Sequence, residues 1–508
     1  MDKLEKQNSN LLLKTLDGET TMSKFFCTET FSNKIYLNDW RESTGCTSDV
    51  VEPATGNVLA KIALASGDDI RSAVTEAKKQ QSHWANLPFD QRGKVLRRAA
   101  ELILQHKDTF IEWNIRECGS IAPKAEAELY GAHEQLNMAA AMTMQPDGIT
   151  LPSTIPGRRN TCRRVPLGVV GVITPWNFPL LLAMRSVAPA LAVGNSVVLK
   201  PDPQSAITGG LLIARLFEEA GLPAGVLQVL PGGAEAGEAL VEHPMTAMIS
   251  FTGSTNVGKK IGRTCGELLK KSALELGGNN AFIVLDDADI EAASSHGAWG
   301  AYLHQGQICM QAGRHFVHES VAEEYISRLA ERAERLRVAD PYLGASDIGP
   351  LINTNQVEKI NKIIAESVEA GAKLITGGHS HDQFYRPTVL SNIRLDMPAC
   401  QQELFGPVAP VITFSSEDEL VEMITASPYG LAAAIHSRSI GRAMKLADRV
   451  PAGMIHINDQ TVNNEFHVPF GGFGDSGNSG RFGGPSNLEE FTQSQWVSVM
   501  DTPVTYPF

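Results

Sequence analysis

A regular alternation of short apolar runs and amphipathic segments between residues 166 and 285 constrains the fold of this chain most strongly. The apolar runs are rich in valine and isoleucine, which is typical of strands that are buried on both faces. They are 169–173, 196–200, 226–229, 247–251 and 281–285. Helical patterns such as 206–220 lie between them, and crossovers between parallel strands are right-handed. The segment therefore predicts a doubly wound parallel sheet with helices on both faces.

A second α/β pattern follows from about residue 286 to 465. It contains the helical stretches 320–337 and 355–370 and an apolar run at 411–414. Pro410 precedes that run, and because proline cannot donate to a ladder, we expect the strand to begin at or just after it. Two such blocks predict an interdomain cleft, which is a common place for a small-molecule site.

Composition, charge and cysteine use exclude several classes of protein. The 508 residues allow about three domains at roughly 100–200 residues each. A formal net charge of −13 argues against nucleic-acid binding, which needs a basic face. Seven scattered cysteines without a Cys-x-x-Cys pair argue against a disulfide framework and a metal site. The longest apolar stretch, 178–193, carries an arginine and two prolines, and no export signal is visible. We expect a cytoplasmic protein that spans no membrane.

The segment Gln305-Gly306-Gln307-Ile308-Cys309 is the sharpest chemical signal. A cysteine in a glycine-containing loop that leads into a helix is partly exposed and close to the helix dipole. Both conditions lower a thiol pKa from about 8.5 and favour the nucleophilic thiolate. The alternative for Cys309, as for the other six cysteines, is a buried and inert thiol.

Two further candidates stand at the ends of apolar runs. Glu275 precedes Gly277-Gly278, where backbone and ligand can approach closely, and burial would raise its pKa and suit it to activate a water. Asn177 follows the run 169–173, at the sheet edge where ligands bind, and its amide could stabilise an oxyanion. The alternatives are a surface glutamate and an Asx turn.

The segment from Phe251 to Lys260 predicts a strand end, a tight turn and a helix start. Free N–H groups at a helix N-terminus bind phosphate. The segment nearly matches a P-loop, but Lys260 stands where a magnesium-binding hydroxyl belongs, so an NTPase is disfavoured. A turn that tolerates phosphate is the remaining prediction, with a plain strand–helix connection as the alternative.

Taken together, seven motifs resemble the aldehyde dehydrogenase superfamily in their order and spacing, from about residue 35 onward. They are Pro175-Trp176-Asn177, Lys200-Pro201, Phe251-Thr252-Gly253-Ser254, Glu275-Leu276-Gly277-Gly278, Gly306-Gln307-Ile308-Cys309, Glu403-Leu404-Phe405-Gly406-Pro407 and Pro469-Phe470-Gly471-Gly472. The segments 456–462, 469–472 and 481–484 are similar to the aromatic-aldehyde branch, which includes the benzaldehyde dehydrogenases.

The resemblance implies a role for each matching residue. Cys309 would be the nucleophile and Glu275 the general base, while Asn177 and the backbone N–H of Cys309 would form an oxyanion hole. Lys200 would meet the adenosine ribose and Glu403 the nicotinamide ribose. The implied cofactor-binding residues are Thr174, Trp176, Lys200, Asp202, Gly253, Ser254, Leu276, Glu403 and Phe405. The implied substrate pocket consists of Phe178, Leu181, Leu182, Arg185, Ile308, Phe466 and Phe470. No metal is expected.

The resemblance also implies two doubly wound parallel-sheet domains and a small bridging element. The expected divisions are a lead-in (1–30), a cofactor-binding domain (31–144 and 166–276), a catalytic domain (277–485) and an oligomerisation element (145–165 and 486–508). Since members of the superfamily assemble as dimers or tetramers, a homodimer or homotetramer is expected.

Two departures from the superfamily pattern bear on cofactor and site. Pro203 stands three residues after Lys200, where NAD-preferring relatives commonly carry a glutamate. The repulsion of a 2′-phosphate is therefore weaker, and we expect NAD use with tolerance of NADP, while Asp202 is a candidate replacement. His304 stands where many relatives have asparagine, and we expect it to be a packed supporting residue.

The implied activity is oxidation of a benzaldehyde-like aldehyde to its carboxylic acid, with hydride transfer to NAD(P)⁺ through a thiohemiacetal and a thioester on Cys309. An apolar, aromatic-bearing pocket suits a flat ring. The alternatives are the same chemistry on aliphatic aldehydes or semialdehydes, and a catalytically silent member with a structural or binding role. Arg185 could attract a ring substituent, although an interdomain salt bridge is the favoured interpretation.

Overall fold

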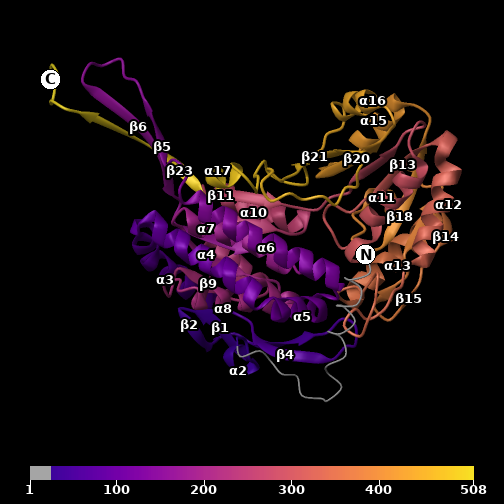
Figure 1. Cartoon of the computed structure of the whole chain (residues 1–508), viewed down its shortest axis with the longest axis horizontal. Coiled ribbons are helices and arrows are strands. Elements are labelled where there is room, and N and C mark those ends of the chain that lie inside the picture. Colours follow the sequence, from indigo (N-terminus) through magenta and orange to yellow (C-terminus); the bar gives the residue numbers. More distant parts are fainter. Residues whose placement is uncertain (1–24) are drawn as a thin grey trace, which may run out of the picture.

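Two seven-stranded sheets form the two lobes of the computed structural model, which describes residues 25–508 (Figure 1). The first sheet has the order β11-β10-β7-β8-β9-β1-β2. Pairing is parallel from β11 to β9 and antiparallel at β1 and β2. Its strands are β1 (Lys34–Leu37), β2 (Asp39–Glu42), β7 (Val169–Ile173), β8 (Ser196–Lys200), β9 (Leu227–Val229), β10 (Thr246–Thr252) and β11 (Lys271–Glu275). The predicted parallel sheet is present, with an added antiparallel edge.

Helices cover both faces of the first sheet, as a doubly wound topology requires. All residues of β7 and β8 are buried, so alternate side chains enter a different core on each face. Val170 packs with α4, α6, α7 and α8, whereas Val169 packs with α3, α9 and α10. These helices are α3 (Gly67–Asn86), α4 (Phe89–Gln105), α6 (Ala122–Met142), α7 (Pro179–Ala192), α8 (Leu212–Glu219), α9 (Ala234–Glu242) and α10 (Thr255–Glu267). The expected helix 206–220 begins as a π-helical turn over Ile207–Leu211.

The second sheet has the order β14-β17-β18-β13-β12-β20-β21 and is parallel except where β14 pairs with β17. Its strands are β12 (Ala281–Val284), β13 (Arg314–His318), β14 (Lys373–Thr376), β17 (Thr388–Ser391), β18 (Val408–Phe414), β20 (Ala432–His436) and β21 (Met454–Ile457). Its helices are α11 (Ile290–Tyr302), α12 (Glu319–Arg335), α13 (Thr354–Glu369), α15 (Glu417–Thr425) and α16 (Ile440–Ala447). The apolar run 281–285 thus belongs to this sheet and not to the first, because β11 occupies the place beside β10.

The expectation that a strand begins at or after Pro410 is wrong. Strand β18 begins at Val408, and its residues up to Pro410 pair with β17. From Val411 onward the recorded pairs are with β13. The missing N–H of Pro410 therefore falls where the strand changes its partner, and the ladder tolerates it there.

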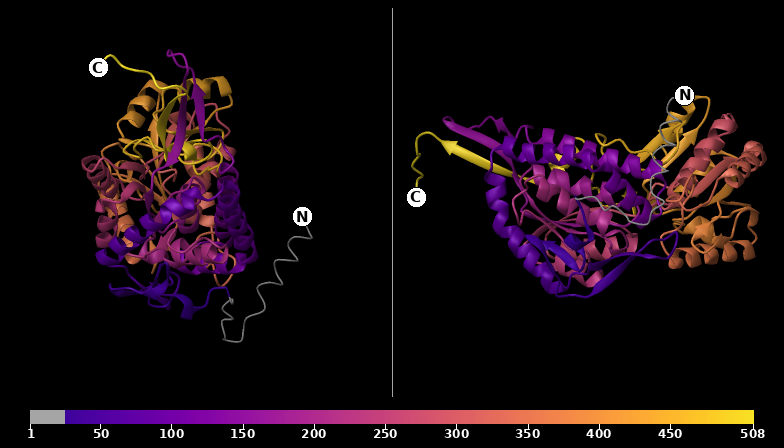
Figure 2. Two further views of the ribbon diagram at one scale, coloured as in Figure 1. Left: turned by 90° about the vertical axis from the view of Figure 1, so that its left-hand side faces the viewer. Right: turned by 60° about the horizontal axis from the view of Figure 1, so that its bottom comes forward.

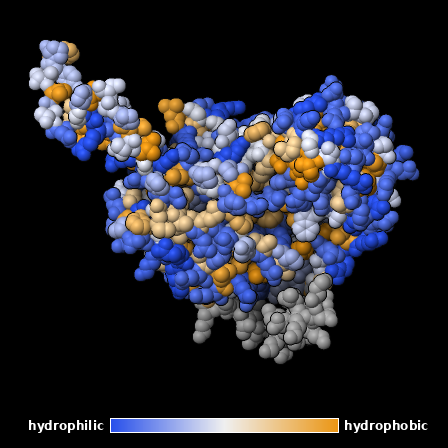
Figure 3. Space-filling model, turned by 45° about the horizontal axis from the view of Figure 1, so that its top comes forward, coloured by the Kyte–Doolittle hydropathy of each residue, from blue (hydrophilic) through white to orange (hydrophobic). Residues whose placement is uncertain are grey.

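A three-stranded antiparallel arm projects from the first lobe (Figures 1 and 2). It consists of β5 (Gly148–Leu151), β6 (Arg158–Pro166) and β23 (Thr492–Met500), with β6 in the middle. Ile149 lies beside Cys162, which in turn lies beside Trp496, so these side chains share one face of the arm. Ile149 and Trp496 are 59% and 70% exposed. Figure 3 shows apolar side chains among the polar ones on this arm.

The smaller elements complete the described part of the chain. They are α2 (Thr28–Phe31), β3 (Thr47–Val51), β4 (Val58–Ala63), α5 (Lys107–Cys118), η1 (Pro203–Ser205), η3 (Leu303–Gly306), β15 (Ser380–His381), β16 (Phe384–Tyr385), α14 (Pro398–Gln401), β19 (Tyr429–Gly430), β22 (Phe473–Gly474) and α17 (Ser486–Glu490). Most of the expected lead-in, 1–24, lies outside the described residues, but Phe26 is buried and stacks on Phe31 with ring centroids 4.4 Å apart. Within 25–508 no helix is both long and apolar enough to cross a membrane.

Candidate active site

The facing edges of the two sheets bring the predicted motifs together. Strands β7 and β10 are neighbours although their crossovers run in opposite directions along the sheet, and ligands bind at such switch points. Residues 174–177 follow β7, residues 253–254 follow β10, and Glu275 ends β11. The chain then passes through Gly277-Gly278 into β12 of the second sheet, while Cys309 lies just before β13. The carboxyl edge of one sheet therefore meets the amino edge of the other.

A cavity of about 230 Å³ lies at this junction. Many predicted site residues line it, namely Trp176, Asn177, Leu182, Gly253, Ser254, Leu276, Cys309, Glu403 and Phe405. Glu275, Thr174, Lys200 and Asp202 are absent from this lining. The cavity thus joins residues that are more than 200 positions apart in the chain, from Trp176 to Phe405.

The loop that presents Cys309 differs from the expected one. No helix follows the cysteine, because the chain continues through a turn into β13. Instead, three consecutive residues before it, His304, Gln305 and Gly306, have φ values of 48°, 58° and 67°. Two of the three are not glycine, and such strained backbone persists only where its surroundings hold it. Here the Gln305 amide donates to the carbonyl oxygen of Gly119 at 2.9 Å.

The side chain of Cys309 is partly exposed, as expected, but the pKa of its thiol shifts upward and not downward. Its side chain borders the cavity, yet the surrounding protein raises its pKa to about 12 by desolvation. The positive charge of Arg185 opposes this rise, whereas the charges of Glu275 and Glu403 add to it. Without a helix dipole at the loop, burial dominates the pKa of the thiol.

The carboxyl group of Glu275 is 2% exposed, and neither oxygen has a hydrogen-bond partner within the described chain. Burial raises its pKa to about 8, while the charges of Arg185 and Arg481 oppose the rise and that of Glu490 adds to it. A carboxylate with a pKa near neutrality is suited to general base catalysis. The predicted rise in pKa therefore agrees with the environment of Glu275.

Asn177 is held by its own side chain at the end of β7. Its amide nitrogen donates to the carbonyl oxygen of Gln307 at 2.8 Å, two residues before Cys309 in the sequence. An amide has two N–H donors, so one remains for a group in the cavity. Asn177 and Cys309 line the same cavity, which is the arrangement that an oxyanion hole requires.

The glycines after Glu275 allow three segments to meet. A Cβ atom at Gly277 would lie 2.6 Å from a carboxylate oxygen of Glu403, and one at Gly278 would lie 2.3 Å from the carbonyl oxygen of Cys309. The N–H of Gly278 donates to Glu403 at 2.9 Å. Only glycine fits at these positions, as the sequence pattern predicts.

The cavity wall on the side of the first sheet offers donors and an aromatic corner. Ser254 precedes α10 without a side-chain cap, which leaves N–H groups of the first turn available to an anion. The rings of Trp176 and Phe405 meet edge to face at 5.5 Å, and Phe405 has a φ of 52°. Asp202 accepts a hydrogen bond from its own turn, at the N–H of Gln204.

Lys200 and Thr174 lie behind this wall. The Lys200 ammonium donates to the carbonyl oxygen of Gly232, and burial lowers its pKa. The N–H of Thr174 donates to the carbonyl oxygen of Lys200 at 3.2 Å. Both residues therefore shape the end of the first sheet in this structure.

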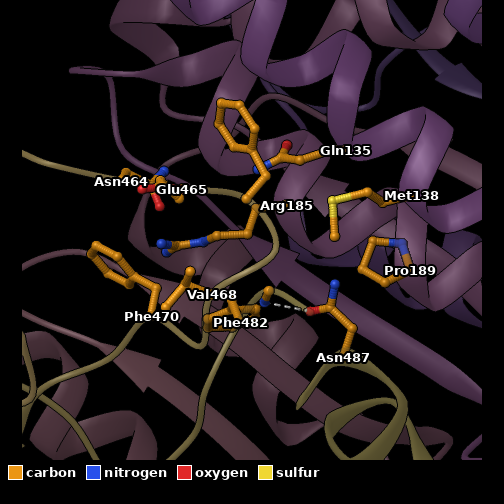
Figure 4. A pocket seen from close by; sticks show the side chains of 12 residues that line it. Gln135, Met138, Arg185, Pro189, Asn464, Glu465, Val468, Phe470, Phe482 and Asn487 are labelled. Atoms are coloured by element: carbon orange, nitrogen blue, oxygen red, sulfur yellow. Dashed lines mark hydrogen bonds between the residues drawn. The ribbon is translucent and has the colours of Figure 1, made fainter. Parts of the chain in front are cut away.

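The residues of the predicted substrate pocket are divided among an apolar cluster that includes Cys309 and two cavities. Phe178, Ile308 and Phe470 pack in one cluster with Cys309. Leu181 and Phe466 approach each other beside Gly131, where a Cβ atom would meet both. Leu182 lines the main cavity, and Arg185, Phe466 and Phe470 line a small neighbouring cavity of about 20 Å³ (Figure 4).

The expected salt bridge of Arg185 is absent among the described residues. Its guanidinium lies 5.0 Å from the ring centre of Phe470 and 4.6 Å from that of Phe482. One nitrogen donates to the hydroxyl of Thr252 at 2.9 Å. The two rings take the place of a carboxylate because cation–π contacts stabilise a buried charge. His304 is buried, and its ring meets Phe178 edge to face at 5.4 Å, as expected of a packed residue.

Four residues at the site were not singled out by the sequence patterns. Gln356 and Lys359 of α13 line the main cavity, and they donate to the carbonyl oxygens of Phe405 and Glu403. Lys124 and Glu128 of α6 form a buried ion pair beneath Asn177. Their spacing on helices is ordinary, so only the tertiary contacts identify them.

Comparison with known proteins agrees with this geometry. The sequence profile of the aldehyde dehydrogenase family matches residues 40–497. The chain is 52% identical to a benzaldehyde dehydrogenase [NAD(+)] of Pseudomonas putida, over 94% of this chain and 98% of the relative. It is 50% identical to a vanillin dehydrogenase of an Amycolatopsis species, over 95% of this chain and 100% of the relative.

Among solved structures, a betaine aldehyde dehydrogenase of Staphylococcus aureus in complex with NAD⁺ superposes with a TM-score of 0.90 at 30% identity. The superposition covers 94% of this chain and 96% of that one. Profile, relatives and fold all extend over the two lobes and the cleft between them. The chain therefore belongs to the aldehyde dehydrogenase family.

Proposed function

We propose that this enzyme oxidises aromatic, benzaldehyde-like aldehydes to carboxylic acids with NAD⁺ as hydride acceptor. The observation that carries the proposal is the cavity that unites Cys309 and Asn177 with Glu403 and Phe405. The aromatic cluster of Phe178 and Phe470 beside Cys309 supports a ring-shaped substrate. The benzaldehyde and vanillin dehydrogenases at 50–52% identity support the same substrate class.

The residues divide the chemistry between them. The Cys309 thiol loses its proton to solvent as its sulfur adds to the aldehyde carbonyl, and the Asn177 amide together with the Cys309 backbone N–H stabilises the oxyanion of the thiohemiacetal. Removing one such donor typically costs about 2.7–4 kcal/mol of barrier. A nicotinamide held beside Glu403 and Phe405 would supply the hydride acceptor, and loss of hydride from the thiohemiacetal carbon would convert it to a thioester on Cys309. The Glu275 carboxylate then takes a proton from water as the water oxygen adds to the thioester carbonyl, and the C–S bond breaks to release the carboxylic acid and the Cys309 thiolate.

The residues around the cavity fit a nicotinamide dinucleotide. The uncapped start of α10 at Ser254 suits a pyrophosphate, and Glu403 is placed to accept from ribose hydroxyls. Phe405 and Trp176 form an aromatic corner for the nicotinamide ring. With Pro203 in place of an acid, we expect NAD to be preferred and NADP to be tolerated.

We further propose a division of labour among the parts of the molecule. The first lobe binds the cofactor, the second lobe supplies the nucleophile, and the arm of β5, β6 and β23 joins copies of the chain. The exposed Ile149 and Trp496 on one face of the arm support assembly into a homodimer or homotetramer. We place the enzyme in the cytoplasm.

A substrate series tests the proposed function. NADH formation is followed by absorbance with benzaldehyde, hydroxy- and methoxybenzaldehydes, hexanal and succinic semialdehyde, and the series is repeated with NADP. The expected result is the highest kcat/KM for an aromatic aldehyde with NAD. A clear preference for hexanal or the semialdehyde would reject the aromatic assignment. The variant Cys309→Ala should show no turnover, and turnover by it would reject the thiol mechanism.

A further inference from the structure

A buried ion pair lies directly behind the proposed oxyanion hole. Lys124 and Glu128 stand one turn apart on α6, with side chains 2% and 0% exposed, and their charged atoms are 2.6 Å apart. The ammonium also donates to the main-chain oxygen of Asn177 at 2.8 Å and to Asn114 at 3.3 Å. All three donors of Lys124 are therefore used, and one of them fixes the main chain of the catalytic amide.

The carboxylate of Glu128 holds the segment that follows Asn177. One oxygen accepts from the backbone N–H groups of Leu180 and Leu181, at 2.8 and 3.1 Å. These donors belong to the first turn of α7, whose preceding residue Phe178 provides no side-chain cap. Glu128 of α6 thus caps the N-terminus of α7, although it is about 50 residues away in the sequence. The helix dipole also favours a negative charge at this end.

The ring of Phe178 completes the contact. The Lys124 ammonium lies 4.3 Å from the ring centre, a cation–π distance. Phe178 in turn belongs to the apolar cluster that includes Cys309. The ion pair therefore touches the chain on both sides of the peptide that links Asn177 to Phe178, and it contacts neither the cavity nor Cys309.

A buried ion pair is costly to maintain, because two charges leave water. A protein with hydrophobic residues of similar volume in place of such a pair is often equally stable, so stability alone does not explain the pair. The ion pair instead helps to fix the orientation of Asn177. Lys124 donates to its main-chain oxygen, and its side-chain amide donates to the carbonyl oxygen of Gln307. A displacement of about 1 Å at such a group can cost about a hundredfold in rate.

We propose that Lys124 is a positioning residue for the oxyanion hole, and that its hydrogen bond to the main-chain oxygen of Asn177 keeps the Asn177 amide aimed beside Cys309. The inference rests on the proposed thiol chemistry, but it concerns only the step in which an oxyanion forms. Loss of the hydrogen bond should therefore slow the reactions of Cys309 that form an oxyanion and leave the rates of its other reactions unchanged.

Two double variants test the hydrogen bond without leaving a buried unpaired charge. Lys124→Gln/Glu128→Gln keeps a neutral donor at position 124, whereas Lys124→Met/Glu128→Gln removes it. Each is compared in two reactions that need neither aldehyde nor cofactor. In acylation by p-nitrophenyl acetate, the sulfur adds to the ester carbonyl, an oxyanion forms and collapses, and nitrophenolate leaves. In alkylation by iodoacetamide, the sulfur displaces iodide and no oxyanion forms.

The expected result is a loss of about tenfold to a hundredfold in the Cys309 acylation rate of the methionine variant relative to the glutamine variant, with equal alkylation rates. Alkylation is measured at the Cys309 peptide by mass spectrometry, and Cys309→Ala defines the background. Equal losses in both reactions would assign the pair a structural role and overturn the inference. Equal acylation rates in the two variants, or no Cys309-dependent acylation in the wild type, would also overturn it.

If the methionine variant does not fold, Lys124→Leu/Glu128→Gln, which also lacks a donor at position 124, is compared with the glutamine double variant. A slower acylation with equal alkylation in the leucine variant supports the inference, and equal rates in both reactions overturn it. Failure of the proposed function is separate, because it is seen as absent NADH formation in the wild type while these reactions proceed.

Discussion

Burial raises the pKa values of both Cys309 and Glu275, because it disfavours their charged forms. The raised values are about 12 and about 8, so Glu275 gives up its proton at a much lower pH than Cys309. At the scale of single residues, both groups must therefore lose a proton before they can act as nucleophile and general base. Arg185 is the charge that favours the ionised form of both groups.

Glu275→Gln should separate the two halves of the reaction. Without a general base, the thioester on Cys309 persists, and a burst of about one NADH per active site is expected, followed by negligible turnover. Stopped-flow absorbance measures the burst. Steady turnover at a rate near that of the wild type would show that another group activates the water.

The buried carboxyl of Glu275 should make stability depend on pH. Its pKa of about 8 in the folded state exceeds the unfolded value of 4.5, so the folded state holds a proton that the unfolded state releases. The resulting stabilisation is complete below pH 4.5 and is lost as the pH rises through 8. Glu275→Gln should therefore raise Tm relative to the wild type more at pH 9 than at pH 6. An equal change at both pH values would contradict the buried titration.

Arg185→Met should shift the pH dependence of kcat upward. The groups whose charges act on Glu275 are Arg185, Arg481 and Glu490, and Arg185 has the largest effect. Since the carboxylate is the active form, kcat should rise about tenfold per pH unit below the midpoint, and the midpoint should move to higher pH. Arg185→Lys, which keeps the charge, is the control. An unchanged midpoint in the methionine variant would exclude this electrostatic role.

At the scale of elements, the turn after β8 bears on the choice of cofactor. Asp202 accepts from the N–H of Gln204 at 2.9 Å, so its carboxylate stabilises η1. Pro203 begins η1 and provides no charge. Position 203 therefore carries no charge that could repel a 2′-phosphate.

Pro203→Glu should lower kcat/KM for NADP by about tenfold or more, which corresponds to roughly 1.4 kcal/mol, while kcat/KM for NAD changes little. The repulsion between the carboxylate and the 2′-phosphate is the cause. Pro203→Gln has the same length without the charge and serves as the control. If both variants lose NADP activity equally, the loss of proline and not the charge is responsible.

At the scale of the whole molecule, the arm of β5, β6 and β23 presents apolar side chains that remain exposed among the described residues 25–508. Ile149, Leu151 and Trp496 are each at least 47% exposed. The pairing of β5 with β6 and of β6 with β23 places Ile149 and Trp496 on the same face. Covering this face is the physical reason to expect assembly.

Trp496→Asp should reduce the mass of the assembly, because a carboxylate in an apolar interface must be desolvated. Light scattering coupled to size exclusion measures the mass. Val499→Asp places the same charge on the other face of β23 and is the matched control. An unchanged mass for Trp496→Asp would show that this face does not join the copies.

Much of the fold was predictable from local patterns. The apolar runs in β7, β8 and β10 indicate a parallel sheet by themselves, because apolar composition and the length of a run are local properties of the sequence. The run 281–285 is predicted as a strand by its composition, and the alternation pattern groups it with the first sheet, whereas the division at residue 277 that the resemblance implies assigns it to the second. Pro410 was judged by a rule for uniform ladders, and the change of partner at that residue is a tertiary feature.

The sequence by itself determined which residues stand at strand ends, because glycines, acids and amides after apolar runs mark those ends directly. Only the tertiary structure decided how Cys309 is presented, that burial raises the pKa of its thiol, that Arg185 lies close to two aromatic rings, and that Lys124 contacts the main chain of Asn177. Burial, electric charge and hydrogen bonding act through space, and the groups that supply them here lie tens to hundreds of residues apart in the chain.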